Sequence, residues 1–298
     1  MIRKGNQAGR PGGASPPPAS VRGAEAAGGG SARPGRARPA CGTFRGVSET
    51  SVSEVARWFA EAEAAVVLTG AGISTESGIP DFRGPQGVWT KNPAAQFMFT
   101  YDNYVAEPEI RRKAWAARLA SPVWTAEPNA GHRALVDYER TGRLRAVLTQ
   151  NIDGLHQAAG SAANRVVELH GTAREVVCLS CGDRNPMPEV LPRIEAGEDD
   201  PACLECGGIL KSATISFGQS LEPDVIEAAV AATRGADLFA AVGTSLGVYP
   251  AAGLCDYAVA RGIRLVIVNA EPTPYDEDAD AVLREPIGEV LPRLVAGA

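Results

Sequence analysis

Ala65-Val66-Val67-Leu68-Thr69-Gly70-Ala71-Gly72-Ile73-Ser74 is the stretch that decides the fold. Its first half is a short apolar run, which is typical of a strand buried on both faces of a parallel sheet. Its second half is a turn with two glycines, which lets the backbone of a strand–helix junction approach a phosphate group. An amphipathic helix is expected before it, over residues 52–62. The stretch therefore predicts the first strand and the first ligand loop of an α/β fold.

The alternation of strand and helix continues along the chain. Apolar runs over 146–148, 166–169, 238–242 and 265–268 predict further buried parallel strands. Helical stretches near 130–139, 223–233 and 251–260 separate them. We expect a doubly wound, mostly parallel, Rossmann-like sheet, whose ligand site lies at the carboxyl ends of its strands.

The glycine turn alone does not identify its ligand, because tight turns need glycine whatever they bind. It departs from the dinucleotide pattern G-x-G-x-x-G, since Thr75 holds the third glycine position and the next glycine is Gly78. No acidic residue at the end of a second strand supplies the usual ribose ligand. These differences disfavour an ordinary nicotinamide dehydrogenase but keep a nucleotide site open.

Charged residues are distributed unevenly along the chain of 298 residues. Residues 1–45 hold eight Lys or Arg and a single Glu, whereas the remainder holds 21 basic and 34 acidic residues. The head over 1–48 is rich in Gly, Pro, Ala and Arg and is expected to be disordered, because it has little apolar surface to bury. We expect one folded domain over 49–298. Because that domain is acidic, nucleic-acid binding is not expected beyond a weak contact of the head.

Three features of the sequence indicate the cellular compartment. No stretch approaches the roughly 18 apolar residues that a membrane span needs, so no membrane partner is expected. The head lacks the apolar core of a secretory signal. Six cysteines are too few for a disulfide scaffold in a chain of this length. A reducing cytoplasm is therefore the expected location.

Four of the cysteines form the strongest local signal. Cys178-x-x-Cys181 and Cys203-x-x-Cys206 are separated by 21 residues, close to the spacing of a zinc ribbon. They lie in a segment over about 175–212 that interrupts the strand–helix alternation and reads as an insert. Four thiolate ligands leave no open position for water, so the predicted single Zn²⁺ is structural. The alternative is that the cysteines are merely buried or redox-active.

A second glycine-rich loop follows the strand over 238–242. Gly243-Thr244-Ser245-Leu246-Gly247 matches the nucleophile pattern G-x-S-x-G of serine hydrolases. That fold needs its histidine after the serine, whereas all three histidines (His132, His156 and His170) come earlier. We therefore interpret this segment as a second ligand loop.

Together these segments resemble the sirtuins, the NAD-dependent protein deacylases, and specifically those of bacterial type. The resemblance runs in order from about residue 50 to the C-terminus. Its segments are Gly70–Ser74, Ser77–Arg83, Thr149–His156, Glu168–Gly171, the four cysteines, Gly243–Leu246 and Val268–Glu271. The resemblance implies that the folded domain is a sirtuin-like catalytic domain with an inserted zinc module.

The resemblance implies that NAD is bound as co-substrate. Ala71, Ser74 and the loop from Ile79 to Arg83 would cover it, and Asp153 would accept a hydrogen bond from the carboxamide. Glu271 would accept from the ribose hydroxyls. The full implied set is Gly70, Ala71, Gly72, Ser74, Ile79, Asp81, Phe82, Arg83, Gln150, Asn151, Ile152, Asp153, Gly243, Thr244, Ser245, Asn269, Glu271 and Val282.

The same resemblance implies the reaction. The enzyme would release nicotinamide and transfer the acyl group of an acyl-lysine to ADP-ribose, with His170 as general base and Asn151 as the other catalytic residue. An imidazole suits proton transfer near neutral pH. An acyl-lysine protein or peptide would pair in extended form with two segments, through Ile215, Phe217, Gly218 and Val248. Gln219 stands where an acid is common, which weakens any expected preference for basic flanking residues.

Two other functions remain open beside the deacylase. A protein mono-ADP-ribosyltransferase could use the same scaffold, and the chain could be a non-catalytic zinc-ribbon binding module. The acyl preference depends on Trp115 and Arg118, the nearest counterpart of a Y-x-x-R pair that binds acidic acyl groups. Since Trp115 lacks a phenol and Arg118 is expected to face solvent, acetyl or longer acyl groups are favoured over succinyl.

Overall fold

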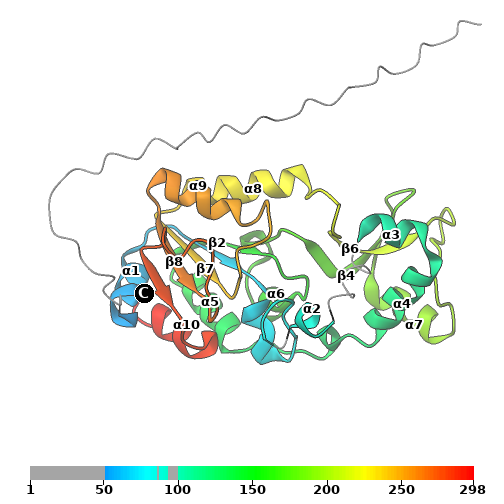
Figure 1. The fold of residues 1–298 in the computed structure, drawn as a ribbon, viewed down its shortest axis with the longest axis horizontal. Helices are drawn as coiled ribbons and strands as arrows, with labels where there is room; N and C mark the ends of the chain where they lie inside the picture. Colours follow the sequence, from blue (N-terminus) through cyan, green and yellow to red (C-terminus); the bar gives the residue numbers. More distant parts are fainter. Residues whose placement is uncertain (1–50, 86, 93–99) are drawn as a thin grey trace, which may run out of the picture. The chain divides into compact units, whose positions relative to one another are not determined.

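The computed structural model describes residues 51–85, 87–92 and 100–298 (Figure 1). The head predicted over 1–48 lies outside these described residues. Within them, no helix combines the length and the apolar character needed to cross a membrane.

The main sheet is parallel throughout and has the order β3-β2-β1-β7-β8-β9. The first strand lies at its centre, so the chain winds outward from it in both directions, as a doubly wound sheet requires. The strands are β1 (Ala65–Thr69), β2 (Leu144–Thr149), β3 (Val166–Glu168), β7 (Leu238–Val242), β8 (Arg264–Val268) and β9 (Ala281–Leu283). The predicted fold class is confirmed.

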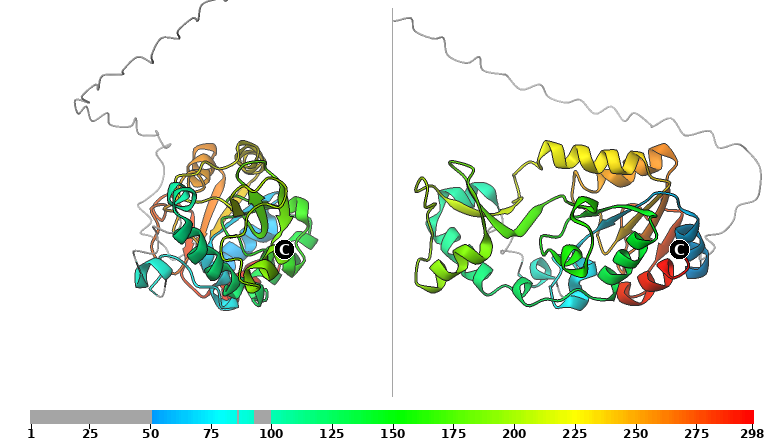
Figure 2. Two further views of the ribbon diagram at one scale, coloured as in Figure 1. Left: turned by 90° about the vertical axis from the view of Figure 1, so that its right-hand side faces the viewer. Right: turned by 180° about the vertical axis from the view of Figure 1, so that it is seen from behind.

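Helices cover both faces of this sheet (Figure 1). Val67 of β1 packs in a core with α1 (Val52–Glu61), α5 (Ala130–Arg140) and α10 (Ile287–Val295). Its neighbour Leu68 packs in a second core with α8 (Pro223–Arg234) and α9 (Gly253–Arg261), which lie side by side in Figure 2. Successive side chains of a strand point to opposite faces, so a strand between two cores must be apolar at every position.

Short elements connect these layers. Among them, η1 (Ala71–Ser77) follows β1 as a 3₁₀ helix. The others are α2 (Val88–Lys91), η3 (Pro122–Trp124), α6 (Leu155–Ala159) and η4 (Ala163–Arg165).

A second, smaller core forms around the cysteine-containing segment. Its antiparallel sheet has the order β5-β4-β6, with β4 (Gly171–Cys178), β5 (Arg184–Pro186) and β6 (Leu210–Thr214). Helix α7 (Met187–Glu195) packs on it, together with α4 (Pro108–Leu119), which α3 (Tyr101–Ala106) precedes. Trp115 of α4 is fully buried in this core beside Val176 and Leu210. The small domain therefore combines the predicted insert with helices from a distant part of the chain.

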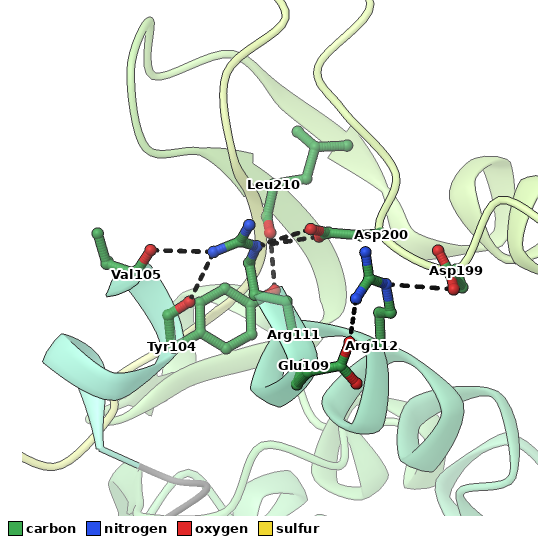
Figure 3. A network of polar contacts seen from close by, with 8 residues as sticks. All are labelled: Tyr104, Val105, Glu109, Arg111, Arg112, Asp199, Asp200 and Leu210. Atoms are coloured by element: carbon green, nitrogen blue, oxygen red, sulfur yellow. Dashed lines mark hydrogen bonds and ion pairs between the residues drawn. The ribbon is translucent and has the colours of Figure 1, made fainter. Parts of the chain in front are cut away.

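Arg111 fastens these helices to the loop before the second cysteine pair (Figure 3). Its Nε lies 3.0 and 2.9 Å from the two carboxylate oxygens of Asp200, and it donates to the carbonyl oxygens of Tyr104 and Val105. The Tyr104 hydroxyl donates to the Leu210 carbonyl at 2.7 Å. Because the Arg111 side chain is largely buried, this ion pair holds the loop more firmly than an exposed one would.

Candidate active site and metal centre

The two predicted ligand loops interlock through three glycines. Gly72 donates its amide to the carbonyl of Gly243 at 2.8 Å, and an added Cβ on Gly72 would lie 2.7 Å from Gly243 Cα. A Cβ on Gly70 would lie equally close to the Gly243 carbonyl oxygen. Gly243 itself has φ +63°, which favours glycine. The close approach of the two loops therefore requires glycine at all three positions, whether or not the loops also approach a phosphate.

Behind the first loop, Asn129 holds η1 in place. Its side-chain amide donates to the carbonyl of Ile73 at 2.7 Å and to the hydroxyl of Ser77 at 3.0 Å. Its side-chain oxygen caps α5 by accepting from the amides of Gly131 and His132. Asn129 was not among the predicted site residues, although an Asn directly before a predicted helix is a recognisable capping signal.

Ser74, Asn151 and Asp153 form a buried polar cluster. The Ser74 hydroxyl donates to Asp153 Oδ2 at 2.8 Å and accepts from Asn151 Nδ2 at 3.1 Å. The Asn151 amide also donates to the Gly70 carbonyl, and Asp153 Oδ1 accepts from the Leu155 amide. The structure therefore brings together predicted residues from η1 and from the loop after β2.

Two histidines lie behind that cluster. His156 Nε2 is 2.9 Å from the Thr69 hydroxyl, His132 Nε2 is 3.5 Å from the Ser74 hydroxyl, and the two ring centroids are 5.0 Å apart. Burial lowers the pKa of His132 to about 4 and that of His156 to about 3. Both imidazoles are therefore neutral near pH 7 and support the cluster as structural groups.

His170 follows β3 and is held by backbone contacts. Its Nδ1 lies 3.0 Å from the Gln150 carbonyl oxygen, and its own carbonyl accepts from the Ile215 amide at 2.8 Å. Burial lowers the pKa of the half-buried imidazole. Since a carbonyl can only accept, Nδ1 carries the proton and Nε2 keeps its lone pair. The Gln150 side chain donates to the Thr244 hydroxyl at 2.9 Å, which links the second ligand loop to the same site.

Asn269, Glu271 and Val282, which the resemblance assigns to NAD, lie beyond β8. Asn269 Nδ2 donates to the Glu271 carbonyl at 2.7 Å, and Arg284 donates to the carbonyls of both residues. These bonds fix the backbone and leave the Glu271 carboxylate exposed. Val282 lies in β9 opposite Ile267.

Aromatic contacts join the loop after η1 to the predicted substrate segment. The Trp89 ring lies 4.8 Å from that of Phe82 and 5.2 Å from that of Phe217, between centroids. Arg83 lies over Trp89, with Cζ 4.5 Å from the ring centroid. The Phe217 carbonyl accepts from the Tyr101 amide at 2.9 Å.

The remaining predicted residues are accessible in part. Those that are half-buried are Ala71, Ile79, Asp81, Ile152, Ser245, Ile215 and Val248, whereas Gly218 is exposed and has φ +85°.

Arg118 differs from the expectation that it faces solvent. Its guanidinium donates to the Ser212 hydroxyl at 2.8 Å and lies over the rings of Tyr104 and Trp115. Burial lowers its pKa. The sequence pattern of α4 predicted an exposed Arg118 because it contains no information on neighbouring elements. In the structure, β6 and α3 cover this position.

The four cysteines cluster as a metal centre. The Sγ atoms of Cys178 and Cys206 are 3.5 Å apart, those of Cys181 and Cys203 are 3.8 Å apart, and all four lie within 4.8 Å of one another. Tetrahedral zinc with Zn–S bonds of about 2.3 Å needs S–S separations of about 3.8 Å, so this donor set fits the ion. Gly182 and Gly207 have φ +76° and +72° directly after their cysteine pairs, in the left-handed conformation that favours glycine.

The model of the Sir2 family matches residues 70–250. The chain belongs to the Sir2 family. It is 59% identical over 231 residues to NAD-dependent protein deacetylase 2 of Streptomyces coelicolor, covering 78% of this chain and 96% of the relative. It is 45% identical to NAD-dependent protein deacetylase 1 of Bradyrhizobium diazoefficiens, covering 81% and 94%.

Solved Sir2 structures agree with this membership. A Sir2–p53 peptide–NAD⁺ complex has TM-score 0.73 and 36% identity, covering 83% of this chain and 98% of that one. A Sir2 variant with deacetylated p53 peptide and 3′-O-acetyl ADP-ribose has TM-score 0.76 and 36% identity, covering 82% and 97%. The fold predicted from the motifs is thus that of the Sir2 family.

Proposed function

We propose that the protein is an NAD-dependent protein-lysine deacylase that transfers the acyl group to ADP-ribose and releases nicotinamide. The observation that carries this proposal is the placement of His170. Its imidazole carries the proton on Nδ1, so Nε2 is available to take another. The adjacent loop is hydrogen-bonded to both glycine-rich segments, through Gln150 to Thr244 and through Asn151 to Gly70. Relatives and structural neighbours with the same fold are named as NAD-dependent deacetylases and as complexes with NAD⁺ and peptide.

The residues of the site suit NAD. The two glycine-rich turns follow β1 and β7, where the backbone can approach a phosphate, and Arg83 offers a cation. Asn151 and Asp153, which are held in place by internal hydrogen bonds, present side-chain oxygens as acceptors. When bound, NAD supplies the ADP-ribosyl acceptor for the acyl group. The residues named for it above, from Gly70 to Val282, remain the proposed contacts.

His170 performs the proton transfer in this proposal. Its Nε2 takes a proton from a ribose hydroxyl, while the Gln150 carbonyl keeps the proton on Nδ1 and steadies the imidazolium that forms. Asn151 orients the site through the Gly70 carbonyl and the Ser74 hydroxyl. The substrate chain would lie extended between the segments that contain Ile215, Phe217 and Gly218 on one side and Val248 on the other.

Mass spectrometry of the products tests the proposal. Incubation with NAD and an acetyl-lysine peptide is expected to yield free-lysine peptide, nicotinamide and O-acetyl-ADP-ribose. ADP-ribose left on protein would instead identify the mono-ADP-ribosyltransferase. NAD-independent peptide binding without any turnover would identify the zinc-ribbon binding module.

We also propose the finer organisation that the sequence suggested. Residues 49–298 form the catalytic domain, and the head over 1–48 lies outside it. The protein acts in the cytoplasm, which suits thiols that must stay reduced to bind zinc. No contribution of membranes is proposed, and any nucleic-acid contact would come from the head alone.

A further inference from the structure

Two large aromatic side chains are exposed among the described residues, and both lie in the proposed substrate segments. Phe217 is 42% exposed and Tyr249 is 66% exposed. Phe217 already packs on Trp89. Tyr249, in contrast, presents most of its surface to solvent beside the proposed contact Val248.

Tyr249 is nevertheless held in one position. Its hydroxyl lies 2.8 Å from the Tyr275 hydroxyl and 3.4 Å from Asp256 Oδ2, while Tyr275 donates to the same carboxylate oxygen at 2.7 Å. Its ring edge rests on α9, because a Cβ added to Gly253 would lie 3.6 Å from Tyr249 Cε1. A fixed aromatic ring loses little entropy when a ligand covers it.

The charge beside this ring is negative. Asp256 is an exposed residue of the first turn of α9, and its carboxylate lies 3.4 Å from the Tyr249 hydroxyl. The nearby backbone amides do not form an anion site, since those of Gly253, Leu254 and Cys255 already donate to preceding carbonyls. An aromatic surface beside a carboxylate favours a cation.

We propose that Tyr249 and Asp256 form a subsite for a Lys or Arg side chain that flanks the acyl-lysine of the substrate. The cation would lie on the Tyr249 ring and approach the Asp256 carboxylate. This inference deepens the proposed function and rests on it. A preference for basic flanking residues would then come from Tyr249 and Asp256 and not from the position of Gln219 in the other substrate segment.

Peptide binding tests the subsite independently of turnover. Fluorescently labelled acetyl-lysine peptides carry Arg, Ala or Glu at each flanking position, and Kd is measured by anisotropy at low salt. At one or more positions the wild-type protein is expected to bind the Arg peptide about fivefold more tightly than the Glu peptide. Asp256→Asn and Tyr249→Ala should each bring that ratio close to one.

Matched variants control for general effects. Tyr257→Phe alters a tyrosine of α9 outside the proposed pair, and Asp137→Asn removes a distant surface carboxylate, so both should keep the wild-type ratio. A wild-type ratio of one at every position, a ratio unchanged in both test variants, or no binding of any peptide overturns the subsite. Turnover of the Ala peptide with NAD is measured separately. Its absence alongside the expected binding ratios would contradict the deacylase function but not the subsite.

Discussion

His170 Nδ1 and the backbone carbonyl oxygen of Gln150 are 3.0 Å apart, and this contact sets the tautomer of the proposed base. Because the acceptor belongs to the backbone at the end of β2, no change of the Gln150 side chain removes it. The main sheet itself therefore determines which ring nitrogen is free to take a proton.

Replacing His170 by Ala is expected to lower kcat/KM for an acetyl-lysine peptide by about 100- to 10,000-fold, because general-base catalysis contributes that range. NAD affinity, measured by calorimetry, should stay near the wild-type value, since the buried Asn151–Asp153 cluster is unaffected. Near-normal deacylation by this variant would contradict the assignment.

The pH dependence follows from the environment of the same imidazole. Burial lowers the His170 pKa, so the neutral base persists below the ordinary histidine value of about 6.5. In a profile of kcat/KM against pH, activity should be retained as pH falls to about 6.5 and decline only below it. An acidic limb centred above the ordinary value would show that His170 is not a buried neutral base.

Stability should also depend on pH through His132 and His156. Their folded pKa values, about 4 and about 3, lie below the unfolded value of about 6.5, so the unfolded chain binds more protons below that pH. The free energy of unfolding is therefore expected to fall as pH drops from 6.5, by up to about 1.4 kcal/mol per histidine per pH unit. Denaturant titrations at pH 7 and 5.5 should show a smaller loss for His156→Gln than for wild type. Equal losses would argue against a buried neutral His156.

Zinc removal should unfold the small domain. Cys203→Ala is expected to release about one zinc per chain, because structural zinc contributes on the order of 10 kcal/mol to such folds. Metal analysis and thermal unfolding measure the effect. Cys255→Ala is the matched control, since Cys255 is a buried thiol of α9 outside the cluster and should retain the metal. Equal zinc content in both variants would contradict the ligand assignment.

Acyl preference tests the surroundings of Arg118. The Tyr104 hydroxyl, whose ring lies below the Arg118 guanidinium, already donates to Leu210, so it cannot join Arg118 on a succinyl carboxylate without losing that bond. We expect kcat/KM to be about 10- to 100-fold lower for succinyl- than for acetyl-lysine peptides. A succinyl preference that disappears in Arg118→Met, but not in Arg112→Met on the same helix, would contradict this expectation.

Patterns with strong local causes were predictable from the sequence. The strands over 65–69 and 238–242 are buried at every position because each lies between two cores, and apart from Thr69 every residue in them is apolar. The cysteine pairs form their own turns. The short strand β9 (Ala281–Leu283) was missed, although its Ala-Val-Leu run is the same as that of the predicted strand over 146–148. The hydrogen bonds of Asn129 to η1 were missed because they join residues more than 50 positions apart, which no local pattern records.

Gly70, Gly72 and Gly243 meet backbone to backbone, with no room for a methyl group on any of the three. A side chain at one position must push the two loops apart, and that displacement makes room for a side chain at another. Their substitutions should therefore show strong positive epistasis, the second change costing less than it would alone. An engineer who varies these loops must treat the three positions as a single unit of design.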